Sequence, residues 1–116
     1  MEIDIYAKWF GMTDAEEAAQ IAGFLMQESH AGFLREATKA LVPEAYMYGR
    51  ANISARVLLG RLPNALRAAE ERERNIHGAT NAEDIERVLK TYRDFVALCA
   101  QKEYETGRPV LIVADY

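Results

Sequence analysis

The fold of this chain is decided by its two ends, MEIDIYAKWF at residues 1–10 and PVLIVA at residues 109–114. The first stretch alternates apolar and polar residues, which is typical of a β-strand with one buried face. The second is an unbroken apolar run, as in a strand covered on both faces. A lone terminal strand cannot satisfy its backbone hydrogen bonds. We therefore predict that both termini pair in one small sheet.

The region between the ends is predominantly helical. Apolar spacing and capping signals predict helices over residues 14–28, 33–39, 55–76 with a break at Pro63, and 81–106. A short edge strand near residues 39–42 or 45–48 would supply a third strand. The whole chain, residues 1–116, is thus predicted to be one α+β domain. Its sheet of about three strands includes both termini and is covered by three to four helices.

The first helix has a clear beginning and an unusual inner face. Thr13 stands three residues before Glu16, the arrangement of a capping box. The stripe predicted to be buried is rich in small side chains and contains Ala15, Ala18, Ala19, Ala22, Leu25 and Met26. So many alanines predict that this helix closely approaches the element on which it packs.

Composition indicates an ordinary globular domain. Half of the 116 residues are hydrophobic and 28% are charged, as in typical soluble proteins. No apolar run approaches the ~20 residues that a membrane span needs. Glu2 and Asp4 stand where a signal peptide would carry positive charge. We therefore expect a cytoplasmic protein without a membrane partner.

Residue counts exclude several kinds of site. A single cysteine, Cys99, rules out an internal disulfide and a cysteine-cluster metal site, and His30 and His77 match no metal-ligand spacing. The net charge of −4 argues against a general nucleic-acid binder, which needs surplus Lys and Arg. We expect no metal, no cofactor and no nucleic-acid partner.

Residues 29–50 are the candidate ligand site, because they are irregular and lie in a locally basic part of an acidic chain. Residues 33–69 hold six Lys and Arg against two Glu. The predicted ligand-binding residues are His30, Arg35, Tyr46, Tyr48 and Arg50. The two arginines would hold a carboxylate or phosphate, with tyrosine hydroxyls as further donors. A solvated mixed surface, with His30 serving only the dipole of a helix end, explains the same pattern.

No catalytic residue is predicted. Cys99 continues the apolar stripe of the last helix, whereas a reactive thiolate needs an electropositive, partly exposed setting. Neighbouring carboxylates such as Glu16 and Glu17 point about 100° apart on a helix, so they do not converge for acid–base work. Nucleophile-elbow, phosphate-loop, dinucleotide and zinc signatures are missing from the sequence. These features favour a protein that is not an enzyme.

Several strings resemble small uncharacterised bacterial proteins, some of them from prophages or other mobile elements. These strings are IYAKW at residues 5–9, GMT at 11–13, HAGFLREA at 30–37, LVPEA at 41–45 and RDFV at 93–96. The resemblance extends over nearly the whole chain. It implies no known activity, so it gives no residue a role.

Three functions stay open at this point. The first is a binding or regulatory accessory protein that acts through a protein partner, favoured by small size, acidic charge and missing catalytic motifs. The second is a small-molecule or anion-binding protein, or an enzyme, with a site near His30 and Arg35. The third is an immunity-type or nucleic-acid-mimic inhibitor, suggested by the charge of −4. Tyr and Met in residues 45–48 also predict self-association, through an edge strand that pairs with its copy.

Overall fold

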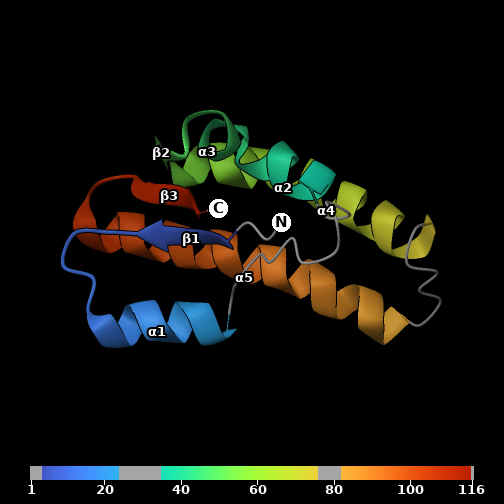
Figure 1. Ribbon diagram of the computed structural model, residues 1–116, viewed down its shortest axis with the longest axis horizontal. Coiled ribbons are helices and arrows are strands. Elements are labelled where there is room, and N and C mark those ends of the chain that lie inside the picture. The colour runs from blue at the N-terminus through green and yellow to red at the C-terminus, as the bar shows by residue number, and fades with distance from the viewer. Residues whose placement is uncertain (1–3, 24–34, 76–81, 116) are drawn as a thin grey trace.

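The computed structural model describes residues 4–23, 35–75 and 82–115 (Figure 1). In these ranges the chain forms three strands and five helices. They are β1 (Asp4–Lys8), α1 (Asp14–Gly23), α2 (Arg35–Leu41), α3 (Pro43–Tyr48), β2 (Arg50–Ile53), α4 (Ala55–Asn75), α5 (Ala82–Thr106) and β3 (Val110–Asp115). The predicted α+β class, with strands near both ends, is confirmed.

β3 is the central strand of the sheet. β1 and β2 both pair with it in antiparallel orientation, in the order β1-β3-β2. Ile112 lies opposite Ala7 on one side and opposite Ala51 on the other. The N-terminal and C-terminal segments therefore meet in one sheet, as predicted.

The two faces of the sheet differ in burial. One face packs against the helices and carries the buried residues Ile5, Ala7, Ile53, Val110, Ile112 and Ala114. The other face, which we call the open face, carries Tyr6, Lys8, Arg50, Asn52, Leu111 and Val113, of which Tyr6, Leu111 and Val113 are half-buried. The core helices all pack on the covered face. The final apolar run, predicted to be covered on both faces, is therefore covered mainly on one.

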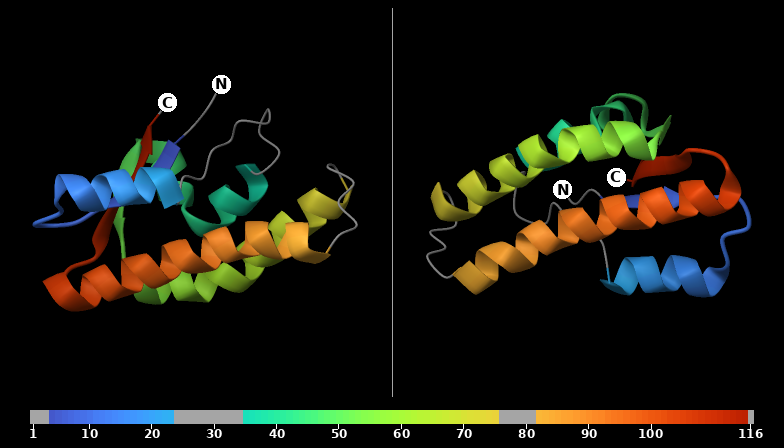
Figure 2. Two further views of the ribbon diagram at one scale, coloured as in Figure 1. Left: turned by 90° about the horizontal axis from the view of Figure 1, so that it is seen from below. Right: turned by 180° about the vertical axis from the view of Figure 1, so that it is seen from behind.

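The core is enclosed by α2, α4 and α5 together with the covered face of the sheet. α4 and α5 pack on each other and extend beyond the sheet (Figure 2). The predicted stripe of α5 is confirmed, since Ile85, Tyr92, Phe95, Val96 and Cys99 are buried. Its partly buried members Val88 and Leu89 pack at the border of the same core.

The third strand lies later in the chain than predicted. Residues 39–42 and 45–48 belong to α2, α3 and the junction between them, so the strand predicted there is wrong. Pro43 occupies the first turn of α3, where its missing N–H removes no helical hydrogen bond. Gly49 ends α3 with a φ of 79°, and its carbonyl accepts the Ala114 N–H at 2.9 Å. That bond begins the pairing of β2 with β3.

α4 runs without interruption through Pro63, so the predicted break is wrong. Pro63 is exposed, whereas Leu58 before it and Ala65 after it are fully buried. Packing of both halves of the helix against α2 and α5 outweighs the single backbone hydrogen bond that the proline removes.

The capping box of α1 is confirmed. The Thr13 N–H donates to Glu16 Oε1 at 3.1 Å, and the Glu16 N–H donates to Thr13 Oγ1 at the same distance. α1 is described as far as Gly23, and the rest of the predicted helix, residues 24–28, lies outside the described residues. The sequence therefore fixes where this helix begins.

The described part of the predicted inner face of α1 is wrong. Ala15, Ala18 and Ala19 do not reach the core, whereas Gln20 is buried; Ala22, Leu25 and Met26 lie outside the described side chains. The Gln20 amide accepts the Ala7 N–H at 2.6 Å and donates to the Ala7 carbonyl at 2.8 Å. α1 lies along the outer edge of β1 (Figure 1), so it meets a strand edge that needs polar partners rather than an apolar face.

A bidentate ion pair joins α3 to α4. Arg61 donates to the two carboxylate oxygens of Glu44 at 2.7 and 2.8 Å, and also to the Leu41 carbonyl at 3.2 Å. The hydrogen bond from Arg61 lowers the pKa of Glu44 below its usual value. Because both side chains remain about one-third exposed, solvent screening limits the value of the pair.

Glu44→Gln is expected to cost about 0.5–1 kcal/mol of unfolding free energy at neutral pH. The folded-state pKa of Glu44 lies below the unfolded value of about 4.3, so its contribution is complete above that pH and is lost as pH falls through the folded pKa. Denaturant titrations of the variant and the wild type should therefore converge in acid.

Glu70→Gln is the matched control for this prediction, because Glu70 pairs with Arg74 in an exposed contact within one helix. Its effect should be smaller than that of Glu44→Gln. A loss for Glu44→Gln that persists unchanged below the pKa of Glu44 would contradict the prediction.

Candidate functional site

The ligand site predicted in residues 29–50 is only partly described. His30 and His77 lie outside the described residues, and Arg35 is described as the first residue of α2. Tyr46 is half-buried, with Lys39 Nζ 5.7 Å from its ring centroid. Whether His30 and Arg35 share a concavity stays a prediction.

Two further predicted residues, Tyr48 and Arg50, are exposed. Tyr48 is 71% exposed on α3, and Arg50 is exposed on the open face of the sheet. Neither the cavity at the end of the sheet nor the cavity between α1 and α5 is lined by Tyr46, Tyr48 or Arg50. The candidate site in the described structure is therefore sought among the residues that line these cavities.

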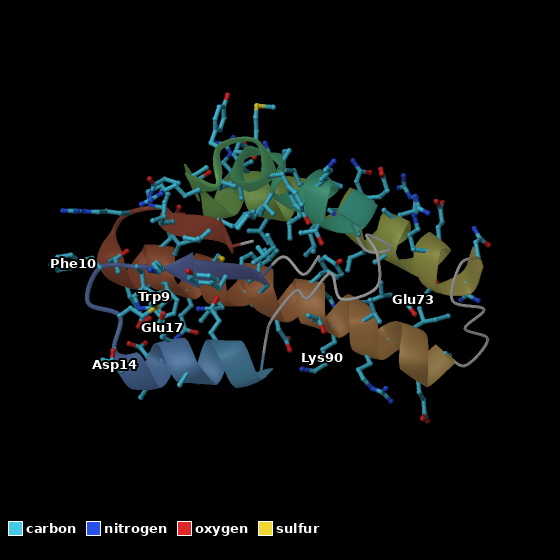
Figure 3. The ribbon with its side chains drawn as sticks, in the orientation of Figure 1. Trp9, Phe10, Asp14, Glu17, Glu73 and Lys90 are labelled. Carbon is cyan, nitrogen blue, oxygen red and sulfur yellow. The ribbon has the colours of Figure 1, made fainter. Side chains whose placement is uncertain are left out.

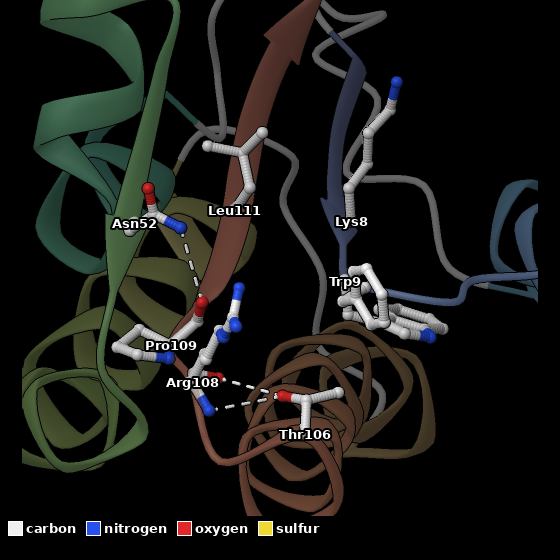
Figure 4. Close-up of a pocket in the computed structure, with 8 residues that line it drawn as sticks. Lys8, Trp9, Asn52, Thr106, Arg108, Pro109 and Leu111 are labelled. Carbon is white, nitrogen blue, oxygen red and sulfur yellow. Dashed lines mark hydrogen bonds between the residues drawn. The ribbon is translucent and has the colours of Figure 1, made fainter.

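A groove of about 290 Å³ lies at one end of the open face, where β1 and β2 end and β3 begins (Figure 4). We call it the sheet groove. It is lined by Lys8, Trp9, Phe10, Asn52, Thr106, Arg108, Pro109 and Leu111. The register of the strands brings lining residues from all three strands together, because Leu111 lies opposite Lys8 on one side and opposite Asn52 on the other.

The turn between α5 and β3 forms one wall of the sheet groove and is held by side chains. Gly107 ends α5 with a φ of 74°, a conformation that glycine adopts without strain. Thr106 Oγ1 accepts the Arg108 N–H at 3.3 Å, and Asn52 Nδ2 donates to the Pro109 carbonyl at 3.3 Å (Figure 4). Asn52 thereby ties β2 to the same turn that presents Arg108.

The lining of the sheet groove is cationic. Lys8 and Arg108 are its charged members, and both are exposed. No described carboxylate forms an ion pair with either of them. Two positive charges that form no ion pair with a described carboxylate thus line one groove in a chain whose net charge is −4.

Aromatic rings accompany these cations. Lys8 Nζ lies 5.6 Å from the centroid of the Tyr6 ring, and Arg108 Cζ lies 5.9 Å from that of Phe10. Such contacts hold a cation over a ring while leaving N–H groups available to a ligand. Phe10 is 84% exposed and projects at the end of the molecule beyond β1 (Figure 3). The sheet groove therefore combines positive charge with apolar surface.

A second cavity of about 380 Å³ lies between α1 and α5. It is lined by Trp9, Glu16, Ala19, Gln20, Asp94, Leu98, Gln101 and Lys102. Lys102 Nζ lies 3.0 Å from Glu16 Oε2 and 3.2 Å from Glu105 Oε2, and 5.2 Å from the Trp9 ring centroid. The hydrogen bond from Lys102 lowers the pKa of Glu16, and the same bond raises the pKa of Lys102. Because Lys102 is already paired with Glu16 and Glu105, this cavity offers no unpaired lysine to bind an anion.

The described residues offer little for covalent or metal chemistry. Cys99 is 1% exposed, and burial raises the pKa of its thiol to about 12, so it is protonated at neutral pH. The prediction that Cys99 belongs to the core is confirmed. Within the described ranges, no three His, Cys, Asp or Glu side chains gather to hold a metal ion.

Comparisons with models of protein families, with curated proteins and with solved structures find no match to this chain. The resemblance to small bacterial and prophage proteins therefore stays a prediction. Among the helices that the structure describes, none combines the length and the apolar character needed to cross a membrane.

Sequence reasoning missed the sheet groove, although a signal for it was present. Lys8-Trp9-Phe10 ends the first predicted strand, and Arg108 immediately precedes the last one. Antiparallel pairing of two strands places the end of one beside the beginning of the other. The predicted pairing of the termini therefore already brings Lys8 and Arg108 to the same end of the sheet.

Proposed function

We propose that this chain is a binding protein that holds a small anion in the sheet groove. The observation that carries the proposal is that two cations, Lys8 and Arg108, line the groove while none of its described lining residues is a carboxylate. A carboxylate or phosphate group suits them, because guanidinium binds such groups bidentately and an ammonium adds a point charge. This positive charge lies in a chain whose net charge is −4.

The apolar part of the lining indicates what else the ligand carries. Trp9, Phe10 and Leu111 lie beside the two cations. Binding sites typically pair a few polar groups that orient the ligand with apolar walls that bury the rest of it. The proposed ligand is therefore a compound that carries an anionic group and an apolar portion.

Binding rather than catalysis is supported by the same residues. The Thr106 hydroxyl in the lining accepts a hydrogen bond from the Arg108 N–H in the turn. No histidine, cysteine or carboxylate is among the described residues that line the groove. Nucleophilic and acid–base catalysis need such groups in contact with one another. The hypotheses of a regulatory accessory protein with a protein partner and of an immunity-type inhibitor stay predictions.

Phenyl phosphate tests this proposal, with Trp9 as reporter. Trp9 is the single tryptophan of the chain and lines the groove, so a ligand bound there should change its fluorescence saturably. A charge-assisted hydrogen bond contributes about 1.5–3 kcal/mol. Lys8→Glu and Arg108→Glu are therefore each expected to weaken binding at least about tenfold.

Arg56→Glu is the control, because Arg56 is also exposed but lies on α4 outside the groove. Inorganic phosphate should bind more weakly than phenyl phosphate, since it makes no apolar contact. The proposal fails if the wild type shows no saturable change, or if both reversals in the groove bind as tightly as the control.

A further inference from the structure

The two edges of the sheet are treated differently. At the outer edge of β1, Gln20 supplies both a donor and an acceptor to the main chain of Ala7. At the outer edge of β2, no described group bonds the outward main chain. An uncovered strand edge is a template for pairing with another chain.

The hydrogen-bond pattern identifies the residues that face outward from β2. The Ala114 N–H bonds the Gly49 carbonyl directly opposite it, so residues 49, 51 and 53 face β3. The N–H and C=O groups of Arg50 and Asn52 consequently point away from β3. The same alternation makes Ala7 face outward from β1, and its bonds to Gln20 agree with this.

We propose that two copies of this chain pair antiparallel through β2, and that Arg50 of each copy completes the sheet groove of the other. The pairing would join the two sheets into one of six strands, three from each copy. The role of the partner's Arg50 in ligand binding rests on the proposed function of the groove. The pairing of the two copies does not depend on that function. Because Gln20 seals the other edge, the assembly stops at two copies.

Charge selects the register of this pairing. If Arg50 lay opposite the partner's Arg50, like charges would face each other directly, which is unfavourable. If Asn52 lay opposite the partner's Asn52, Arg50 would face Ser54, which follows the strand. With Arg50 opposite the partner's Asn52, both outward residues of each copy join the ladder and no like charges are opposed.

This register brings a third cation to the sheet groove. The side chains of Arg50 and Asn52 both lie on the open face of the sheet. Side chains directly opposite each other in an antiparallel pair have Cβ atoms about 4.5–5.5 Å apart. The partner's Arg50 thus stands next to Asn52, which lines the groove. Arg50, predicted from sequence to bind a ligand, does so here from the neighbouring copy.

Apolar surface beside β2 supports a second copy as the occupant. Met47 and Tyr48, each 71% exposed, lie on α3, which joins β2 through Gly49 and contacts it (Figure 1). Tyr and Met are enriched at interfaces between proteins. Residues 45–48, predicted from sequence to mediate self-association, remain part of the proposed interface. The strand that pairs with the second copy is Arg50–Ile53 rather than residues 45–48.

Sedimentation of the full chain without ligand tests the pairing. We expect the wild type to be a dimer and Asn52→Arg to be a monomer, because each Arg50 would then face an arginine. The double variant Arg50→Glu with Asn52→Arg should restore the dimer. Met47→Asp, at an exposed position that the monomer tolerates, should also dissociate it. A wild type that stays monomeric at millimolar concentration, or an Asn52→Arg variant that stays dimeric, overturns the proposal.

Phenyl phosphate titration tests the contribution of Arg50 to the groove. Arg50→Gln keeps a neutral pair with the partner's Asn52, so it should remain dimeric but bind phenyl phosphate about tenfold more weakly. If the Arg50→Gln variant is dimeric and binds phenyl phosphate as tightly as the wild type, the partner's Arg50 does not contribute to the groove and this part of the proposal is overturned. A wild type that dimerises but does not bind phenyl phosphate would support the pairing and refute the proposed ligand, so the two proposals fail separately.

Discussion

Removal of residues 110–116 should abolish cooperative unfolding of this protein. β3 is the only described partner of both β1 and β2, so its loss leaves two strands without a ladder. Val110 and Ile112 are fully buried, and Leu111 and Val113 are half-buried. At about 1.5–3 kcal/mol for each fully buried side chain, and less for the others, the loss is roughly 5–9 kcal/mol. That equals the whole stability of many domains, about 5–15 kcal/mol.

Circular dichroism and denaturant titration of the truncated chain would check this result. Two point variants separate the covered face from the open face. Ile112→Ala should cost about 2–5 kcal/mol, because it opens a cavity in the core, whereas Val113→Ala should cost about 1 kcal/mol. A truncated chain that unfolds cooperatively near the wild-type midpoint would refute the central role of β3.

The pairing of the termini could be predicted because both end segments carry strong local signals. Alternation in residues 1–10 specifies a strand with one buried face, and the apolar run at residues 109–114 requires cover. The stripe of α5 was equally predictable, since its apolar residues recur with helical spacing over the whole helix. In these elements local preference and tertiary packing agree.

The middle strand could not be predicted because its own sequence hardly favours a strand. Arg50–Ile53 reads RANI, in which only Ile53 is a strong strand former. Residues 45–48 contain more strand-forming side chains, yet Pro43 begins a helix there and Gly49 ends it. The identity of β2 comes from its pairing with β3, which is a tertiary effect.

The sheet groove shows the same division between local and tertiary information. The pairing of the termini places Lys8 near Arg108, but only the register puts Lys8, Leu111 and Asn52 side by side. The run at residues 109–114 does not alternate, so the sequence does not specify which of its residues face the open side. That is why a cationic groove at the strand ends was overlooked in favour of residues 29–50.

Gln20→Ala is expected to cost about 2–6 kcal/mol of unfolding free energy. The substitution leaves the N–H and C=O of the fully buried Ala7 without their partners, and each unpaired buried group costs about 1–3 kcal/mol. Gln101→Ala is the matched control, because Gln101 is an exposed glutamine on α5. Its loss should be within about 0.5 kcal/mol of zero. Equal effects of the two variants in urea titrations would show that Gln20 does not stabilise the edge of β1.

Gln20→Glu provides a sharper test, because its effect depends on pH. A protonated carboxyl offers one donor and one acceptor, as the Gln20 amide does, whereas an ionised carboxylate offers only acceptors and would face the Ala7 carbonyl. Burial and this repulsion would raise the folded-state pKa of the introduced carboxyl above its unfolded value of about 4.3. The variant should therefore be close to wild type near pH 4 and lose stability as pH rises toward 7. A deficit that is the same at both pH values would mean that the side chain at position 20 does not bond the Ala7 carbonyl.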